Sequence, residues 1–571
     1  MEFLNGSCKK EPVIDIEGPE DVNPDNDKLE EKDEDSSSSF VSTIIEGYGS
    51  KLKWVLLFVA IFLYFSYFSV ALALFALGFY ESGQSVLPLV YLTVAALIIL
   101  IIYFVKRKFK NEILDFAIIP TRKVIDKHWH KLKWFLLLVP LCGIVAIILL
   151  SAAKRPYNLV SLIGWIFFLI VLTVCSHSPR RISWRPVIGG FALQFYFAAF
   201  ILKWDKGQDL FQELGSLFTS FLGFSKFGAQ FVFGKLEDHF FAFLVLPVII
   251  FFSTVITMLY YLGIMQAIIG KIAFIMRITL GTTAAESLCA AGNIFVGQTE
   301  APIMIRPFLA IMTMSELHAV MVGGFGTIAG AVLAAYILKG VPAAHLIAAS
   351  VMNAPTALAV SKILYPEVGM SKISKMKEVI KEKQPFNNVI EAAAAGASSA
   401  ISLVANVGAN LIAFVALLFF ANSVLGWFGA FVCLPELSFE VICSYILRPL
   451  VFIMGVEWND AGAVAKLLGI KTFLNEFVAY DKLADFINNR VTCGSGTILT
   501  VSSFFESEVI ATYALCGFAN FSSIGIQLGG LGPMAPNRTG DLAKLAVSAL
   551  FGGIVTNLMT ACVAGKDLVK I

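Results

Sequence analysis

The stretch GIKTFLNEFVAY, residues 469–480, carries Lys471, Asn475 and Glu476 inside otherwise apolar sequence. A cation, an amide and a carboxylate can bind ions or hydrogen-bonding solutes, but a hydrophobic environment opposes their burial. A carboxylate at the centre of a bilayer costs about 2.5–3.5 kcal/mol on insertion scales. We therefore expect Glu476 to face a polar cavity, and we treat it as a candidate binding residue.

A second stretch, NIFVGQTEAP at residues 293–302, places Asn293, Gln298, Thr299 and Glu300 beside Gly297. Glycine interrupts a helix and frees backbone carbonyls and amides, which a membrane protein tolerates where a cavity or neighbouring protein satisfies them. Freed carbonyls with an Asn or Thr oxygen form a suitable cage for a small hard cation such as Na⁺. The amides, the hydroxyl and the carboxylate suit a polyhydroxylated solute that forms hydrogen bonds.

A third stretch, CGFANFSS at residues 516–523, adds Phe518 as a flat face for stacking. Asn520 and Ser523 are three residues apart and would share one side of a helix. Taken without its neighbours, Phe518 is better explained by ordinary packing. The three stretches together indicate a site for a cation and a polar solute.

The composition places these residues in a membrane protein. Of the 571 residues, 57% are hydrophobic and 15% are charged, and the mean hydropathy is +0.79. Soluble domains usually contain roughly 25% charged residues. The net charge of +2 gives no reason to expect a nucleic acid as a partner. The nine Cys residues are widely spaced, which argues against a disulfide framework or a zinc site.

The order of segments predicts an all-α polytopic protein with about eleven transmembrane helices. Residues 1–50 are acidic and read as a disordered cytoplasmic tail. Three N-terminal transmembrane helices are expected within 51–155, and a core that contains the three polar stretches within 156–571. The basic loops fall on one side if the eleven spans alternate, so the N-terminus is expected in the cytoplasm and the C-terminus outside.

Two apolar stretches, 285–309 and 441–480, are interrupted by Gly, Pro and carboxylates, and we predict that both are re-entrant helical hairpins. Similar sequences follow them: SELHAVMVGGFGTIAG at 315–330 and SEVIATYALCGFANFSSIG at 507–525. A hairpin and a broken span, present twice in opposite orientation, form the inverted repeat of secondary transporters. Glu300 and Glu476 occupy matching places in this repeat. The structural alternative is that they cap helix ends or pair with Arg306 and Lys471.

Together, these stretches of the sequence resemble the concentrative nucleoside transporter family. GIKTFLNEFVAY fills every defined place of that family's signature, in which Gly or Ala, Lys and Asn-Glu-Phe-Val-Ala stand at fixed spacing. The resemblance extends to FVGQTEAP, SELHAVM, SLVANV and ATYALCGFAN and covers roughly residues 155–565. It implies a sodium-coupled symporter that moves nucleosides by alternating access, and not an enzyme; HExxH, GxSxG and phosphate-loop motifs are absent from the sequence.

The resemblance also implies roles for the candidate residues. In that family the Gln-Thr-Glu of the first hairpin binds the nucleobase, the Glu of Asn-Glu-Phe and the Asn and Ser after Gly-Phe hold the ribose hydroxyls, and the Phe packs on the base. Carried onto this chain, these residues are Gln298, Thr299 and Glu300 for the base, Glu476, Asn520 and Ser523 for the ribose, and Phe518 and Val332 for the pocket lining.

The family's sodium site maps to Asn293, Thr327 and the carbonyls of Val296 and Ile328. Gly297, with Thr327 and Ile328, resembles the broadly selective subtype, which implies transport of purine and pyrimidine nucleosides such as uridine. H⁺ in place of Na⁺ stays open as the coupling ion. The resemblance implies a homotrimer in the plasma membrane and no cofactor. A transporter of another polar metabolite remains the nearer alternative, and a channel the more distant one.

Overall fold

The computed structural model describes parts of 55–97 and then residues 158–234, 246–369, 371, 386–434, 436–492 and 501–565. The expected acidic tail, most of the three N-terminal helices and residues 566–571 lie outside the described residues. The chain divides into two compact units, Met1–Trp129 and His130–Ile571. The first contains an apolar helix at Ile61–Ala76. All elements discussed below belong to the second unit.

The described part of the chain is helical and has no strands, which confirms the predicted all-α membrane fold. Within it, five helices are long and apolar enough to cross a membrane, and a sixth crossing arises if one bent pair is a single span. That pair is α10 (Leu246–Tyr261) with α11 (Ile264–Leu280), and its two parts are bent by 79°. The expected total of eleven spans stays a prediction.

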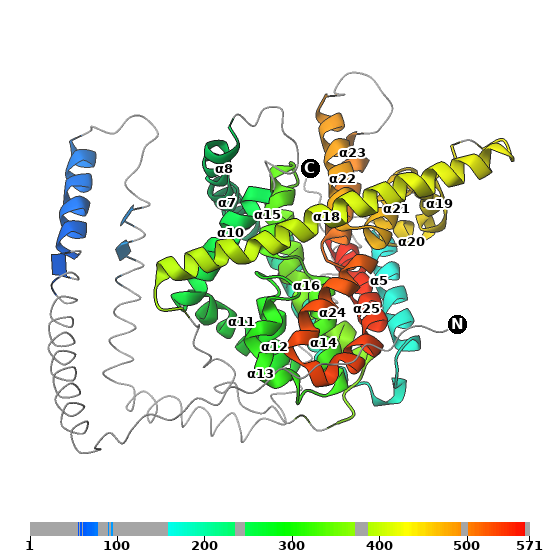
Figure 1. Ribbon diagram of the computed structural model, residues 1–571, viewed down its shortest axis with the longest axis horizontal. Helices are drawn as coiled ribbons and strands as arrows, with labels where there is room; N and C mark the ends of the chain where they lie inside the picture. The colour runs from blue at the N-terminus through cyan, green and yellow to red at the C-terminus, as the bar shows by residue number, and fades with distance from the viewer. Residues whose placement is uncertain are drawn as a thin grey trace, which may run out of the picture. The chain divides into compact units, whose positions relative to one another are not determined.

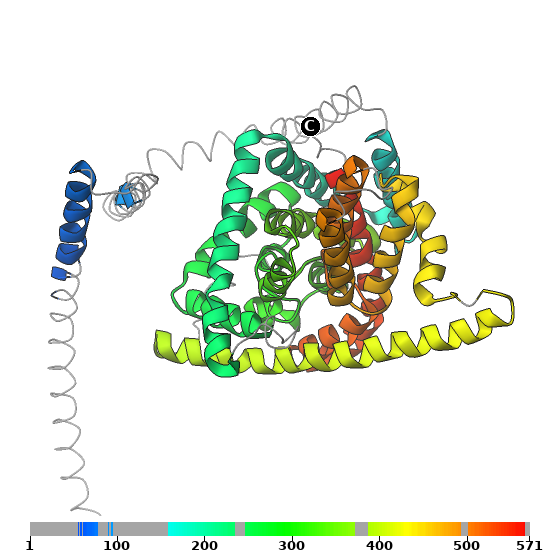
Figure 2. The ribbon, with the colours of Figure 1, turned by 90° about the horizontal axis from the view of Figure 1, so that it is seen from above.

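One helix is much longer than a membrane requires. The helix α18 (Val389–Ala430) has 42 residues, which corresponds to about 63 Å at 1.5 Å per residue. The hydrocarbon core of a bilayer is about 30 Å thick. Helix α18 packs against α10 and runs along one face of the second unit (Figures 1 and 2). Among the described residues of the second unit, four α-helices precede α10: α5 (Asn158–Val174), α6 (Trp184–Ala198), α7 (Asp205–Gly223) and α8 (Ser225–Phe233).

The first half of the core contains the first hairpin, Ala284–Leu309. Its outgoing arm is α12 (Ala284–Gly292), and its return arm consists of η4 (Ala301–Ile305) and α13 (Arg306–Leu309). A broken helix follows, formed by α14 (Met314–Gly326) and α15 (Gly330–Leu338). We call residues 327–329 the first break. The long buried helix α16 (Ala343–Leu364) completes this half.

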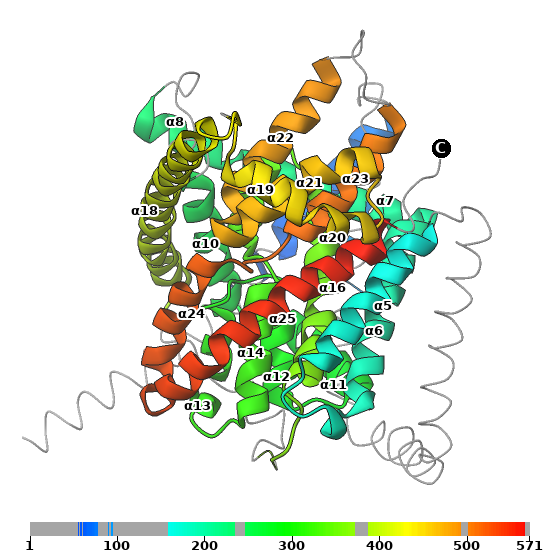
Figure 3. The same cartoon turned by 90° about the vertical axis from the view of Figure 1, so that its right-hand side faces the viewer.

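The second half repeats this order. The second hairpin consists of α21 (Trp458–Phe473) and α22 (Glu476–Thr492), and the broken helix consists of α23 (Val501–Leu515) and α24 (Phe521–Met534). Residues 516–520 are the second break, and α25 (Thr539–Gly565) ends the half. Helix α25 crosses α14 and α16 (Figure 3), and it packs against both.

The range 441–480 expected for the second hairpin is too early. Residues 439–453 form two separate short helices, α19 (Phe439–Ile446) and α20 (Arg448–Ile453). Gly455 then turns the chain with a φ of 104°, a conformation that glycine adopts readily. The hairpin therefore begins at Trp458. Its tip lies at residues 474–475, where Asn475 Oδ1 accepts a hydrogen bond from the Val478 amide at 3.0 Å.

Candidate functional site

The helices α12 and α14 each begin at a capping box and end at a residue predicted to bind sodium. The Thr283 and Glu286 pair caps the N-terminus of α12, and the equivalent pair of Thr313 and Glu316 caps α14. The C-cap of α12 is Asn293, and the C-cap of α14 is Thr327. The two predicted sodium ligands therefore lie where two packed helices end, and the orphan carbonyls at helix C-termini favour cations.

Asn293 and Thr327 both contact the last turn of α14 at Gly323. A Cβ at Gly323 would lie 2.9 Å from Asn293 Nδ2, and Thr327 Oγ1 donates to the Gly323 carbonyl at 2.8 Å. Both side chains are 1% exposed. Asn293 Oδ1 has no hydrogen-bond partner among the described residues. A buried amide oxygen without a partner is costly, and together with a hydroxyl it suits a hard cation.

The other two predicted sodium ligands flank this point. Val296 lies in the tip of the first hairpin and Ile328 in the first break, and both are buried. The tip and the break are joined directly, because the Gly330 amide donates to the Phe295 carbonyl at 3.0 Å. The residues present thus fit a Na⁺ ion held by neutral oxygens.

The residues after the tip of the first hairpin point toward the second half of the core. Gln298 is 4% exposed, and its Oε1 has no hydrogen-bond partner in the described part of the chain. A Cβ at Gly324 would lie 2.9 Å from Gln298 Cβ and 2.5 Å from Gln527 Nε2. Thr299 packs on α24, since a Cβ at Gly530 would lie 2.4 Å from Thr299 Cγ2. The first hairpin therefore contacts the broken helices of both halves.

Glu300 begins the return arm of the first hairpin. Its Oε2 accepts a hydrogen bond from the Gly297 amide at 2.8 Å. The residue is exposed, although its neighbours Gln298 and Ala301 are buried. An exposed carboxylate beside a buried tip is available to a ligand.

Glu476 lies at the corresponding place of the second hairpin, as the first residue of α22. Its carboxylate accepts hydrogen bonds from Asn520 Nδ2 at 2.5 Å and from the Tyr336 hydroxyl at 3.4 Å. Asn520 is the N-cap of α24, and its Oδ1 accepts from the Ser523 amide at 2.9 Å. Glu476, Asn520 and Ser523 are 3%, 1% and 2% exposed. These three predicted residues form one buried polar cluster.

Phe518 and Val332 lie beside that cluster. The Phe518 amide donates to the Thr327 carbonyl at 3.2 Å, which joins the second break to the first. The Phe518 ring is partly exposed. Val332 is 1% exposed and lies one turn before Tyr336 on α15, so that both residues share a face of that helix.

The residues around the two glutamates approach one another, although Glu300 and Glu476 form no hydrogen bond with each other. The second-half residues are hydrogen-bonded to one another, and the first-half residues reach them through α24 and the two breaks. Two further residues escaped the sequence reasoning, Tyr336 and Gln527. Each follows a predicted residue, Val332 and Ser523 respectively, by four positions. Helical spacing was the signal that could have revealed them.

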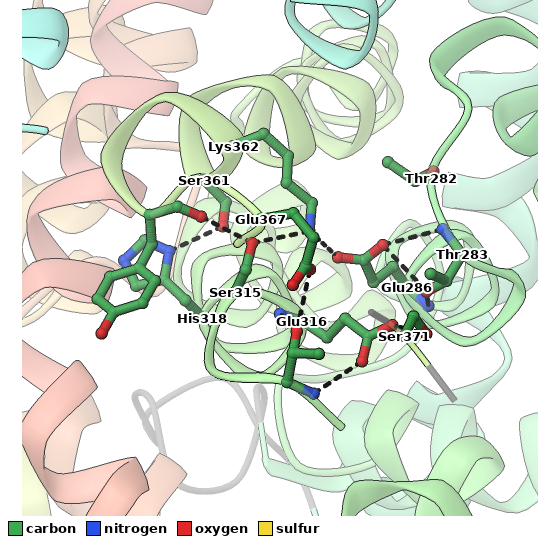
Figure 4. Close-up of polar contacts among 12 residues, drawn as sticks. Thr282, Thr283, Glu286, Ser315, Glu316, His318, Ser361, Lys362, Glu367 and Ser371 are labelled. Carbon is green, nitrogen blue, oxygen red and sulfur yellow. Dashed lines mark hydrogen bonds and ion pairs between the residues drawn. The ribbon is translucent and has the colours of Figure 1, made fainter. Parts of the chain in front are cut away.

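A second polar network holds the opposite ends of α12 and α14 (Figure 4). The Lys362 ammonium of α16 forms an ion pair with Glu286, donates to Ser315 Oγ at 2.9 Å and lies 3.5 Å from Glu367 Oε2. Thr313 Oγ1 also donates to Glu367 Oε2 at 2.9 Å. One lysine therefore ties together the beginnings of the two helices whose other ends carry Asn293 and Thr327.

Three family models match successive parts of the chain. The model described as "Na+ dependent nucleoside transporter N-terminus" matches residues 163–236, and "Nucleoside recognition" matches 242–342. The model described as "Na+ dependent nucleoside transporter C-terminus" matches 345–565. The matched residues include both hairpins and both breaks.

Characterised relatives match over most of their length. Solute carrier family 28 member 3 of Homo sapiens is 49% identical over 483 residues, which cover 84% of this chain and 70% of that protein. Sodium/nucleoside cotransporter 2 of Rattus norvegicus is 47% identical over 482 residues, covering 84% and 73%.

Two solved structures of CNTnw also match the fold. One is in an inward-facing substrate-bound state, with a TM-score of 0.66 and 37% identity over 72% of this chain and 97% of that chain. The other is a variant in an outward-facing state, with a TM-score of 0.68 and 37% identity over 72% and 99%.

Proposed function

This chain belongs to the sodium-dependent nucleoside transporter family, and from that premise we propose that it is a secondary active symporter carrying both purine and pyrimidine nucleosides into the cell. It is a multi-pass membrane transporter and not an enzyme, and Na⁺ is its coupling ion. The structural observation that supports the proposal best is the buried hydrogen bond between Glu476 and Asn520.

In the proposed complex, the second-half cluster binds the ribose. Glu476 and Asn520 offer a carboxylate and an amide that match neighbouring sugar hydroxyls, and Ser523 adds a hydroxyl. Asn520 Nδ2 donates to the Glu476 carboxylate and the Ser523 backbone amide donates to Asn520 Oδ1, and these bonds limit the free-energy cost of burying the carboxylate and the amide. Nucleoside hydroxyls would replace these internal partners.

The base would occupy the space between the two breaks. Gln298, Thr299 and Glu300 present an amide, a hydroxyl and a carboxylate at the tip of the first hairpin, and they suit the donors and acceptors on the edge of a base. The partly exposed ring of Phe518 offers a face for the base to pack against. Val332 would complete the apolar wall.

Sodium coupling follows from the position of the proposed ion. Na⁺ bound by Asn293 and Thr327, with the carbonyls of Val296 and Ile328, would join the tip of the first hairpin to the first break. The ordered tip would hold Gln298 in place for the base. Nucleoside then improves Na⁺ binding by the same factor by which Na⁺ improves nucleoside binding. Loaded with both, the hairpins would move together and release them on the inner side.

Broad selectivity is proposed from the space at Gly297. A Cβ there would lie 3.2 Å from Ala329 Cβ and 3.4 Å from Glu300 Oε2. A larger residue would therefore crowd the carboxylate proposed to read the base. Glycine leaves room for Glu300 to serve the larger purine and the smaller pyrimidine.

The proposal places the protein in the plasma membrane as a homotrimer, with its N-terminus in the cytoplasm and its C-terminus outside. Helix α18 supports the trimer, because it exposes large apolar side chains along its length and contains the small-residue segment 391–414. Measuring the mass of the detergent-purified protein tests the proposed trimer, and the mass of a monomer would contradict it.

Uptake into proteoliposomes tests the function. Radiolabelled uridine and adenosine should both accumulate above their external concentrations when Na⁺ is higher outside, and neither should accumulate without a Na⁺ gradient. Equilibration without accumulation would indicate a channel. Sodium-driven uptake of another polar metabolite in place of both nucleosides would refute the substrate assignment.

A further inference from the structure

The second hairpin carries a buried lysine. Lys471, near the end of α21, is 1% exposed, and its ammonium donates to the Ala514 carbonyl at 2.8 Å. Ala514 belongs to the last turn of α23, directly before the second break. From the other arm of the hairpin, Tyr480 donates to the Thr512 carbonyl at 2.8 Å. Backbone carbonyls at the C-terminal end of α23 thus accept hydrogen bonds from side chains of both arms of the second hairpin.

The first half has a corresponding arrangement without a lysine. The carbonyl end of α14 precedes the first break, as that of α23 precedes the second. Asn293, at the end of the outgoing arm, precedes Glu300 by seven residues; Lys471, in the last turn of its arm, precedes Glu476 by five. Asn293 presents an amide oxygen that has no partner among the described residues, whereas Lys471 presents an ammonium bonded to a carbonyl.

We infer that the Lys471 ammonium is the fixed counterpart, in the second half of the core, of the exchangeable sodium ion proposed for the first half. Both cations would lie between the outgoing arm of a hairpin and the negative end of the helix before a break, where a positive charge is stabilised. This inference rests on the proposed sodium site.

The adjacent carboxylates fit the same comparison. Glu476 begins α22 directly after the tip of the second hairpin, and Lys471 lies in the last turn of α21 before it; Glu300 likewise follows the proposed sodium site in the first hairpin. In each half a cation at the break would hold a hairpin so that its glutamate faces the substrate. Because Lys471 cannot leave, the second hairpin stays in its binding conformation, and only the first hairpin responds to external Na⁺. Lys471 is therefore a positioning residue.

Three substitutions separate the charge of Lys471 from its volume. Lys471→Met retains a long side chain without charge, Lys471→Arg retains the charge, and Lys471→Ala leaves a space. Propylammonium replaces the three carbons and the ammonium that the Ala substitution removes, and 1-propanol is its uncharged control. Each variant is reconstituted in proteoliposomes, and Na⁺-driven uridine uptake is measured with and without the additive.

We expect Lys471→Met and Lys471→Ala to reduce uptake at least about tenfold, the scale for loss of a buried cation at a helix C-terminus. Lys471→Arg should retain more uptake than Lys471→Met. Propylammonium should restore uptake several-fold in Lys471→Ala, and it should leave the wild type and Lys471→Met unchanged. Wild-type uptake by Lys471→Met would overturn the inference, as would equal rescue by 1-propanol.

A second measurement applies if the Lys471→Ala variant folds poorly. If Lys471→Ala is too unstable to transport, its thermal midpoint should rise toward that of the wild type in propylammonium and not in 1-propanol. An unchanged midpoint overturns the inference. The wild type distinguishes the two proposals: without sodium-driven nucleoside uptake in the wild type, the proposed function itself fails. If the wild type transports and only the Lys471 results disagree, the sodium site stands and the fixed counterpart is wrong.

Discussion

In the first half of the core, the end of α14 meets Asn293, whose amide oxygen has no partner among the described residues, whereas in the second half the end of α23 meets the ammonium of Lys471. The glutamates differ in the same sense: Glu300 is exposed, and Glu476 is buried among hydrogen-bond partners. These contacts fit the proposal that the first half responds to ligands and that the second half is preformed.

This asymmetry explains how a duplicated architecture can couple one ion gradient to one solute. If both halves needed an exchangeable cation, the site would be complete only when both were bound. A covalently attached cation in one half removes that requirement. It also explains why the polar residues of the segment 469–480 occur together: Lys471 stabilises the end of a neighbouring helix, Asn475 caps the start of α22, and Glu476 faces the polar cluster.

The largest loss of transport is expected from a substitution in the second half of the core. Glu476→Gln removes the charge that accepts hydrogen bonds from Asn520 and Tyr336 and is proposed to hold the ribose. A hydrogen bond to a charged group contributes about 1.5–3 kcal/mol, so kcat/KM for uridine should fall roughly 10- to 150-fold. Asp485→Asn on the exposed side of α22 is the matched control and should transport normally. Normal uptake by Glu476→Gln would refute the ribose role.

Asn293→Ala should weaken Na⁺ binding in the first half of the core. Loss of one of four proposed oxygen ligands should raise the Na⁺ concentration for half-maximal uptake by about tenfold, the scale of one lost interaction of roughly 1.4 kcal/mol. Gln266→Ala, which removes an amide on α11 bonded to the Tyr260 carbonyl, is the control. A sodium activation curve that coincides with that of the wild type would exclude Asn293 as a ligand.

A smaller change is expected in the first half when the space at Gly297 is filled. Gly297→Ser adds a side chain 3.2 Å from Ala329 Cβ and close to the Glu300 carboxylate. The ratio of adenosine to uridine uptake should fall several-fold, because the larger base loses more room. Competition between the two labelled nucleosides measures this ratio. An unchanged ratio would show that Gly297 does not determine selectivity.

The smallest effect is expected from a substitution at the N-terminal ends of α12 and α14, the helices whose other ends carry Asn293 and Thr327. Lys362→Met should loosen α12 relative to α14 and raise the half-saturating Na⁺ concentration about threefold, since the effect is transmitted through two helices. The KM for uridine at saturating Na⁺ should stay unchanged, and Lys362→Arg should resemble the wild type. If Lys362→Met lowers only thermal stability, with an unaltered sodium curve, the network has no part in positioning the sodium site.

The polar stretches of the sequence indicated the candidate site residues because polar groups in apolar helices are rare enough to stand out. Glu476, Asn520 and Ser523 do meet in one cluster. The sequence could not show that Tyr336 joins them, because this residue lies in the apolar run AVLAAYIL and its contact with Glu476 spans 140 positions. Tyrosine in such a run looks like packing until the fold is known.

The boundaries of the second hairpin were predicted less well than its residues. The sequence pattern does not show that α20 ends before the hairpin begins, because the turn at Gly455 depends on backbone geometry. The network around Lys362 was missed for another reason. Lys362, Ser315 and Glu286 come from three helices far apart in the sequence, and their pairing depends on the packing of α12, α14 and α16.

Sodium and nucleoside binding to the purified protein, each measured as a function of the other, tests the central claim most directly. If Na⁺ orders the first hairpin, raising Na⁺ should tighten uridine binding, and raising uridine should tighten Na⁺ binding by the same factor. Asn293→Ala should bring that factor close to one while uridine still binds weakly. Uridine binding that is independent of Na⁺ in the wild type would contradict the account.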